Sequence, residues 1–273
     1  MCSVIAWAGK LPPRLLDRLM CESEVRGRDS TGLAFRTEKS TVIYRQVIRP
    51  RSFVKLNRVA LAEASRSACG IAHARRASRG MPVNVDNAHP FSYRRVFFAH
   101  NGRIRNWEEL KKGLSESPDK YDVKYSDRVT TDSMVLGPHI VHRDFARPEG
   151  CMGLVWLDHG NAFALRTAKE LEIALIKWKF GRDSGSVCIA ASTEAIILNA
   201  VKKLALKPDI TFYKVNEGVV YQLTENGPLD HGSVEVNANN SEDAFTSSVA
   251  NAIKAGLDDE LKGGDARAYG YFS

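Results

Sequence analysis

The sequence lacks the cysteine pattern of a disulfide framework or a zinc site. Its five cysteines are odd in number, widely spaced and form no C-x-x-C pair. They are Cys2, Cys21, Cys69, Cys151 and Cys188. We therefore expect no metal and no cofactor, and a cytoplasmic location in which the thiols stay reduced. A reduced thiol remains free to act as a nucleophile.

Long apolar runs are also missing. No run approaches the roughly 18–20 residues of a membrane helix, and the first residues lack the basic-then-apolar pattern of a signal peptide. The composition, 44% hydrophobic and 26% charged over 273 residues, is typical of a globular protein. We expect one domain over residues 1–230 and a polar appendage over 231–273, which contains a weak helix. That helix either packs on the domain or docks a partner.

The formal net charge is +7, mainly because arginines are scattered over the first 105 residues. Such an excess attracts nucleic acid or an acidic partner protein. The sequence has no Gly-rich phosphate loop and no aromatic-basic repeat, so direct nucleic-acid binding is possible but not favoured. No membrane association is expected.

Apolar patterning predicts an α+β protein built as a layered sandwich with mostly antiparallel sheets. Strands are expected over residues 2–7, 31–36, 41–47, 69–73, 96–100, 152–157, 162–166, 171–177, 187–191 and 218–223, and helices after Pro13, Asn106 and Asp132 and over 193–201. Asn106 and Glu109 have the spacing of a capping box, and Thr131 stands at the expected start of the next helix.

Cys2 directly follows the initiator methionine. Removal of Met1 would leave one residue with both a thiol and an α-amine, whose usual pKa values are about 8.5 and about 7.7–8.0. The amine can then accept the thiol proton near neutral pH. Taken alone, Cys2 would be interpreted as a small apolar residue at the start of a strand, and the motifs further along the chain reverse that preference.

Four further segments follow Cys2 in order. They are residues 26–32 (RGRDSTG), 70–80 (GIAHARRASRG), 87–91 with 99–106 (NAHPF and AHNGRIRN), and 131–133 (TDS). With Cys2, this ordered set resembles the class II glutamine amidotransferases, which are N-terminal-nucleophile (Ntn) enzymes. The resemblance covers residues 2–200 and implies the four-layer αββα sandwich of Ntn hydrolases.

The resemblance also implies roles for the matching residues. Cys2 would be the nucleophile, and Asn101 and Gly102 would supply two neutral donors to the tetrahedral oxyanion. Arg75 would bind the α-carboxylate of glutamine with its guanidinium fork, and Asp132 would bind the α-ammonium. The alternatives are a tight turn at Asn101 and Gly102, a surface arginine and a helix-capping aspartate.

Several other positions match the family with less specific roles. Ser78 and His89 match positions that line the glutamine pocket, and Arg26 and Gly27 match the segment packed against the nucleophile. Asp29 and Ser30 are interpreted as structural residues of a turn. His73 and His100 stand in apolar strands and are interpreted as core histidines without a metal-ligand pattern.

Three positions depart from the family pattern: Val25, Ala74 and Arg76. We expect them at the pocket wall and not at the nucleophile. They leave open a γ-glutamyl compound as substrate instead of free glutamine.

The sequence thus predicts a glutamine amidotransferase subunit that hydrolyses the glutamine side-chain amide through a Cys2 γ-glutamyl thioester. No synthetase or sugar-isomerase sequence follows, so we expect ammonia to pass to a separate acceptor enzyme. The alternatives are a stand-alone γ-glutamyl amidase and a catalytically silent binding or scaffold module with the same fold.

Overall fold

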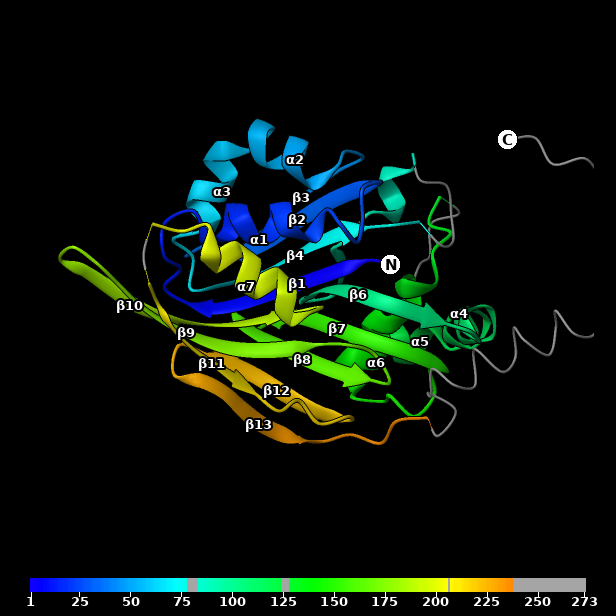
Figure 1. Cartoon of the computed structure of the whole chain (residues 1–273). Helices are drawn as coiled ribbons and strands as arrows, with labels where there is room; N and C mark the ends of the chain where they lie inside the picture. The colour runs from blue at the N-terminus through cyan, green and yellow to red at the C-terminus, as the bar shows by residue number, and fades with distance from the viewer. Residues whose placement is uncertain (78–82, 124–127, 206, 238–273) are drawn as a thin grey trace, which may run out of the picture.

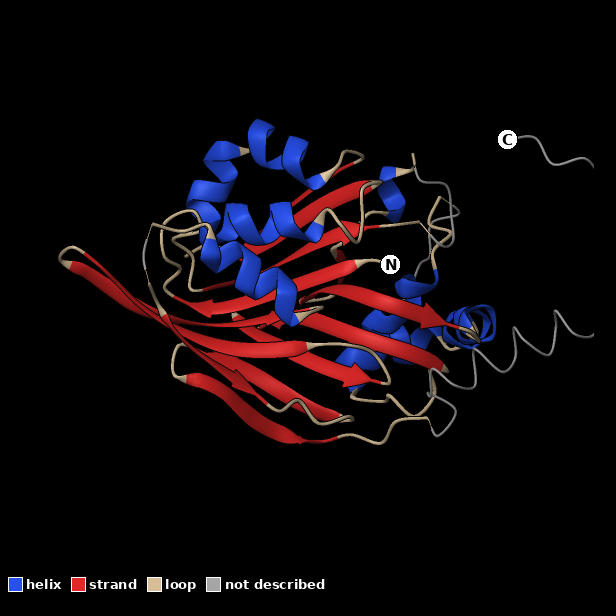
Figure 2. Cartoon of the chain, in the orientation of Figure 1, coloured by secondary structure: helices blue, strands red, loops and turns tan. Residues whose placement is uncertain are grey.

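Two β-sheets stacked face to face form the centre of the molecule, and helices cover both outer faces (Figure 1; Figure 2). The structure is a computed structural model that describes residues 1–77, 83–123, 128–205 and 207–237. All strand pairings within these ranges are antiparallel. Within the described residues, no helix is long and apolar enough to cross a membrane.

The seven-stranded sheet has β1 near its middle, between β10 and β4. In spatial order its strands are β11 (Asp209–Tyr213), β9 (Glu172–Phe180), β10 (Asp183–Ala191), β1 (Ser3–Gly9), β4 (Cys69–Arg75), β2 (Ser30–Arg36) and β3 (Thr41–Gln46). The register pairs Ser3 with Ala74, so the start of β1 lies beside the end of β4. This pairing brings the N-terminus to the segment that follows Arg75.

The six-stranded sheet packs against it. In spatial order its strands are β13 (Gly227–Ser233), β12 (Val219–Thr224), β8 (Asn161–Thr167), β7 (Gly150–Asp158), β6 (Val96–Ile104) and β5 (Phe91–Tyr93). Side chains from both sheets fill the space between them, among them Val4, Ala6, Ala99 and Val155. Small residues dominate on β1 and β6 here, which lets the sheets approach closely.

Helices form the two outer layers. Over the seven-stranded sheet lie α1 (Leu15–Ser23), α2 (Pro50–Leu56), α3 (Arg58–Ala64) and α7 (Glu194–Lys202). Against the six-stranded sheet lie α4 (Trp107–Ser115), α5 (Pro118–Tyr121), α6 (Leu136–His142) and the 3-10 turn η2 (Asp132–Val135). A further 3-10 turn, η1 (Val85–Asn87), precedes β5. The helix, sheet, sheet, helix order confirms the predicted four-layer αββα sandwich.

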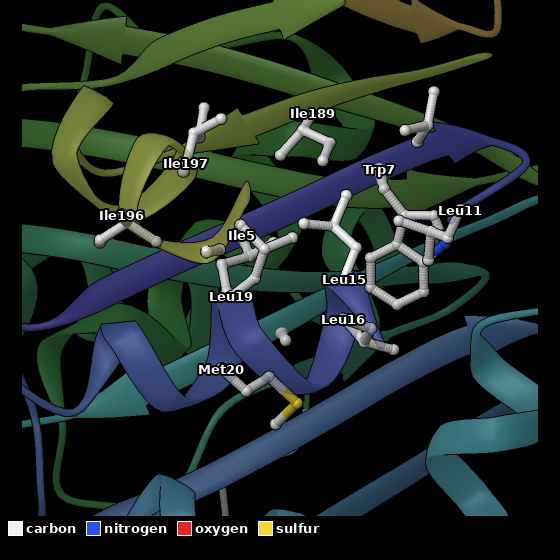
Figure 3. Close-up of a cluster of buried hydrophobic side chains, with 14 of the residues drawn as sticks. Ile5, Trp7, Leu11, Leu15, Leu16, Leu19, Met20, Ile189, Ile196 and Ile197 are labelled. Carbon is white, nitrogen blue, oxygen red and sulfur yellow. The ribbon is translucent and has the colours of Figure 1, made fainter. Parts of the chain in front are cut away.

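β1 is apolar on both faces because each face meets a different layer. Ile5 and Trp7 point to the helical side, where they join Leu15, Leu16 and Leu19 of α1 (Figure 3). Val4 and Ala6 point to the space between the sheets. A buried strand with both faces covered produces the continuous apolar run seen in the sequence.

We expect Leu19→Ala to lower the free energy of unfolding by about 2–5 kcal/mol, because it removes a fully buried side chain and leaves a cavity. Urea titration followed by tryptophan fluorescence measures this change. Leu198→Ala on α7 is the matched control: this leucine is 40% exposed, and its truncation should cost about 0.5 kcal/mol or less. Equal losses in the two variants would contradict the packing described here.

The predicted caps are wrong although their helices are present. Asn106 makes no side-chain cap to α4; its amide donates to Arg147 O at 3.0 Å and its Oδ1 accepts from Glu149 N at 2.9 Å. Thr131 likewise makes no cap. In both cases a partner other than the local helix end takes the side chain, which propensity alone does not reveal.

The division at residue 230 stays a prediction. Strand β13 continues to Ser233, so the first residues of the expected appendage lie in the sheet. Residues 238–273, including the expected weak helix, lie outside the described ranges.

Candidate active site

Cys2 lies at the start of β1, half-buried, against the residue that follows Arg75. The backbone N–H of Arg76 donates to Cys2 Sγ at 3.3 Å, and the thiol donates to Arg76 O at 3.3 Å. Burial raises the pKa of the Cys2 thiol, while the bonds to Arg76 and the charge of Arg75 act in the opposite direction. The expectation that Arg76 lies away from the nucleophile is therefore wrong, because its backbone contacts the sulfur.

Arg26 fixes the backbone of Cys2. Its Nε donates to Cys2 O at 2.9 Å, and a second guanidinium nitrogen pairs with Glu170 at 3.1 Å. Arg26 follows the end of α1, and this end is tied to β1 by the hydroxyl contact of Ser3 with Ser23 at 3.1 Å. Cys2 is thus held by the segment that follows the helix packed on its own strand.

Gly27 permits the close approach of this segment to β4. A Cβ at this position would lie 2.4 Å from Ala74 O, nearer than real contacts allow. Two residues on, Asp29 N donates to Arg75 O at 2.9 Å and Asp29 Oδ2 accepts from Ala77 N at 2.7 Å. Asp29 is therefore structural, as expected, but it braces the neighbouring segment instead of its own turn.

Asn101 reaches β1 through a serine. Its Nδ2 donates to Ser192 Oγ at 3.2 Å, and the same hydroxyl accepts from Val4 N at 2.9 Å. Ser192 N in turn donates to Val4 O at 3.1 Å. The buried asparagine is thereby tied to a residue two positions from Cys2.

Ser192 was not predicted from the sequence. It directly follows β10 and is fully buried. Because its partners stand 91 and 188 positions away along the chain, no local pattern marks it. A serine directly after the apolar second half of β10 was the signal available.

Gly102 occupies a backbone conformation that side chains rarely adopt. Its φ is +151°, and a Cβ would meet Cys151 O at 1.9 Å. Both residues of the Asn-Gly pair lie within β6, opposite Gly153 and Met152 of β7. The alternative interpretation of this pair as a tight turn is therefore wrong.

Arg75 and Asp132 are both buried, at 2% and 3% exposed. Burial has the largest effect on the Arg75 guanidinium and lowers its pKa. The charges of Cys2, Asp29 and Asp132 act in the opposite direction and raise this pKa. Asp132 Oδ2 accepts from Ile104 N at 2.7 Å and Oδ1 accepts from Thr131 Oγ1 at 3.2 Å. Arg75 is thus not a surface arginine. The Asp132 carboxylate accepts a bond from the backbone of β6 instead of capping a helix.

Three buried histidines lie beside this group. The rings of His73 and His89 stack at 4.1 Å, His73 Nε2 is 3.1 Å from His100 O, and His100 Nδ1 is 2.9 Å from Ser133 Oγ. Burial lowers the pKa of His73 to about 3 and lowers the pKa values of His89 and His100 as well. All three are therefore neutral near pH 7, which agrees with the interpretation of His73 and His100 as core histidines.

We expect the free energy of unfolding to fall as the pH drops from about 6.5 towards 3. His73 takes up its proton in the unfolded chain near pH 6.5 but in the folded chain only near pH 3, so stability is complete above pH 6.5 and is lost below it. The slope is about 1.4 kcal/mol per pH unit for each such histidine. Urea titrations at pH 7, 6 and 5 measure it.

The matched variant for this prediction is His73→Gln, which keeps a polar side chain and removes the titrating ring. Its free energy of unfolding should change less steeply with pH than that of the wild type. The difference in slope should be about 1.4 kcal/mol per pH unit, the contribution of one such histidine. An unchanged slope would assign the acid sensitivity to other groups.

Ser78 lies outside the described residues, so its expected place at the pocket is untested. Among the described residues, no group of three or more His, Cys, Asp or Glu side chains is arranged to hold a metal ion. The structure brings Cys2, Arg26, Gly27, Arg75 and Asp132 into one neighbourhood, with Asn101 tied to the same strand.

Comparison with known proteins adds named relatives to this geometry. No family model matches the chain. A glutamine–fructose-6-phosphate aminotransferase of Caulobacter vibrioides is 40% identical over 120 residues, which is 42% of this chain and 18% of that protein. The corresponding protein of Bartonella henselae is 28% identical over 251 residues, 86% of this chain and 40% of that protein.

The chain carries a class II glutamine amidotransferase domain. It spans less than half the length of these curated relatives. The fold of the domain agrees with that of a glutamine phosphoribosylpyrophosphate amidotransferase from B. subtilis, with a TM-score of 0.63 and 13% identity over 85% of this chain and 49% of that chain. This likeness places the amidotransferase domain among the Ntn-hydrolase sandwiches.

Proposed function

We propose that this chain hydrolyses the side-chain amide of glutamine to glutamate and ammonia, with Cys2 as nucleophile. The observation that carries the proposal is the position of Cys2. Its carbonyl is held by Arg26, its sulfur faces the backbone of Arg76, and the buried charges of Arg75 and Asp132 act on it. A nucleophile, an anion-binding group and a cation-binding group thus occur together.

The first step needs a base next to the thiol. Burial raises the pKa of the thiol, so little thiolate forms near pH 7 without help. Once Met1 is removed, the α-amine of Cys2 accepts the thiol proton, and the sulfur attacks the amide carbon. The amine then returns the proton to the departing ammonia, and water cleaves the γ-glutamyl thioester to glutamate.

Oxyanion stabilisation is proposed for Asn101 and Gly102. The amide of an asparagine carries two N–H groups, and Ser192 takes one of them. The other would donate to the oxyanion together with the Gly102 backbone. Because Ser192 also bonds Val4, the donor is oriented before substrate arrives, which is the requirement for strong electrostatic stabilisation.

Recognition of the amino acid head is proposed for Arg75 and Asp132. A buried guanidinium binds the α-carboxylate with two parallel bonds, and a buried carboxylate binds the α-ammonium. Asp132 already accepts two bonds from protein donors, which fixes its orientation. We assign His89 to the pocket wall, Arg26 and Gly27 to placement of the nucleophile, and Ser78 to the pocket by its sequence match.

We further propose that ammonia passes to an acceptor enzyme separate from this chain. The relatives quoted above are named for an amino transfer that pairs glutamine with fructose 6-phosphate, and an amino acceptor for the ammonia of this chain is proposed by that likeness. A stand-alone γ-glutamyl amidase is the second candidate. It is favoured by one observation: Arg76 contacts the sulfur through its backbone, its side chain is exposed, and its charge acts on the N-terminal amine, which suits a larger anionic substrate.

The test is glutamate production from glutamine by the purified chain, with intact mass measured before and after treatment with a glutamine-analogue electrophile. We expect loss of Met1, turnover of glutamine and one adduct on Cys2. Turnover of γ-glutamyl amides but not of glutamine would favour the amidase. Retained Met1 with no adduct would favour the silent scaffold module and overturn the proposal.

A further inference from the structure

A cavity lies at the opposite end of β1 from Cys2. Its volume is about 1130 Å³, and its walls come from the segment after β1, from α1, from α2 and α3, and from β9 and β10. In Figure 1 these helices lie together over one end of the seven-stranded sheet. At about 3.3 Å per residue, the seven residues of β1 separate this cleft from Cys2 by about 23 Å.

The lining of this cleft is strongly basic. Seven lining residues are Lys or Arg and three are Asp or Glu. The cations are Lys10, Arg14, Arg18, Arg51, Lys55, Arg58 and Arg66. Lys10 pairs with Asp183 inside the cleft, and Arg51 pairs with Glu24 at 3.6 Å.

The remaining acid on α1 is surrounded by cations. Arg14, Arg18 and Arg58 all act on Asp17, yet burial, the largest effect, raises the pKa of this carboxyl. Three guanidinium groups therefore face one carboxylate that is itself poorly solvated. Positive charge remains in excess at this point of the cleft.

Part of the cleft lining is apolar. Trp178 Nε1 donates to Lys10 O at 2.9 Å, and the ammonium of Lys10 lies 5.5 Å from the centre of the indole ring. Leu11, Pro13 and Val54 add apolar surface. A concave cavity of this size, lined by apolar side chains and several charged groups, is more typical of a small-molecule site than of a flat protein interface.

We propose that this cleft binds a small molecule carrying two or more phosphoryl groups. Three acids line the cleft against seven cations, and Glu24 outside the lining pairs with one of these cations, Arg51, so an excess of positive charge remains. A phosphoryl group carries a charge of about −1.5 to −2 near pH 7, so two of them suit this excess. The guanidinium fork of arginine matches phosphate oxygens in pairs, and arginine is the commonest lining residue. Free polyphosphates and nucleotides share this chemistry.

Binding in the cleft does not depend on glutamine hydrolysis, but helix α1 connects the cleft to the segment that holds Cys2. α1 lines the cleft with Arg18 and Cys21, and its last residue, Ser23, contacts Ser3 of β1. A ligand that braces α1 would therefore act on the helix that precedes Arg26. Binding itself requires neither Cys2 nor glutamine.

The test is isothermal titration calorimetry with inorganic pyrophosphate and with ATP, one probe for each source. We expect both to bind the wild-type chain and Cys2→Ala alike. Arg58→Glu/Arg66→Glu should weaken binding at least about tenfold. Arg18→Ala should weaken it in the same direction, and thermal unfolding confirms that each variant is folded.

The matched control is Lys39→Glu/Lys202→Glu, which makes the same change in net charge at two exposed lysines outside the cleft. Its affinity should stay within about twofold of the wild type. Equal weakening in both double variants would show diffuse attraction and overturn the proposal. The proposal would also be overturned if neither pyrophosphate nor ATP binds. It would likewise be overturned if a single-stranded oligonucleotide binds more tightly than both and its affinity does not change with the cleft substitutions.

Discussion

Cys2→Ala is expected to reduce glutamate production from glutamine by on the order of 10⁶-fold, to the level of the buffer, because it removes the atom that forms the thioester. Substrate binding should persist, since Arg75 and Asp132 are untouched. The measurement is a coupled glutamate assay together with equilibrium binding of glutamine. The Cys2 side chain is half-buried and its truncation is small, so the fold should survive.

Cys21→Ala is the control for this prediction. Cys21 is another half-buried thiol. It lies on α1 and lines the basic cleft rather than the site around Cys2. It should retain wild-type turnover. Equal turnover in Cys2→Ala and the wild type would exclude Cys2 as the nucleophile and leave the domain without its proposed chemistry.

Asn101→Ala is expected to lower kcat about 10²–10³-fold with little change in KM, because the lost amide donates to the oxyanion only in the transition state. Steady-state kinetics on glutamine measures both constants. Ser192→Ala should lower kcat in the same direction but less, since it leaves the amide in place and removes the hydroxyl that orients it.

Asn161→Ala provides the comparison for the asparagine substitution. Asn161 is exposed at the start of β8 and bonds only neighbouring groups of its turn and of β12 among the contacts described. Wild-type kcat is expected. If Asn101→Ala instead raised KM and kept kcat, Asn101 would bind ground-state glutamine and the assignment of the oxyanion donor would be wrong.

The sequence was most informative where local pattern and chemistry coincide. The apolar run of β1 predicted a strand covered on both faces, and the ordered motifs predicted the αββα sandwich. Segments without strong periodicity were missed: α2 and α3, two seven-residue helices, and the edge strands β11 and β13, whose exposed residues weaken the alternation.

Prediction failed where a residue's role depends on partners distant in the chain. The side chain of Asn106 bonds the backbone near residue 148 instead of capping its helix, and Ser192 joins Asn101 to Val4. Arg76 contacts the thiol through its backbone, which carries no side-chain signal. The sequence named the chemically active residue types, but the groups that orient them became visible only in three dimensions.

The bond from Arg26 to the carbonyl of Cys2 has a consequence for maturation of the chain. This carbonyl belongs to the peptide that follows Cys2, so the bond is unaffected by cleavage of the peptide that precedes it. Met1 is itself 60% exposed and open to an aminopeptidase. Under the proposed removal of Met1, the bond from Arg26 would hold the carbonyl of Cys2 both before and after cleavage, and the cleavage would add a free α-amine.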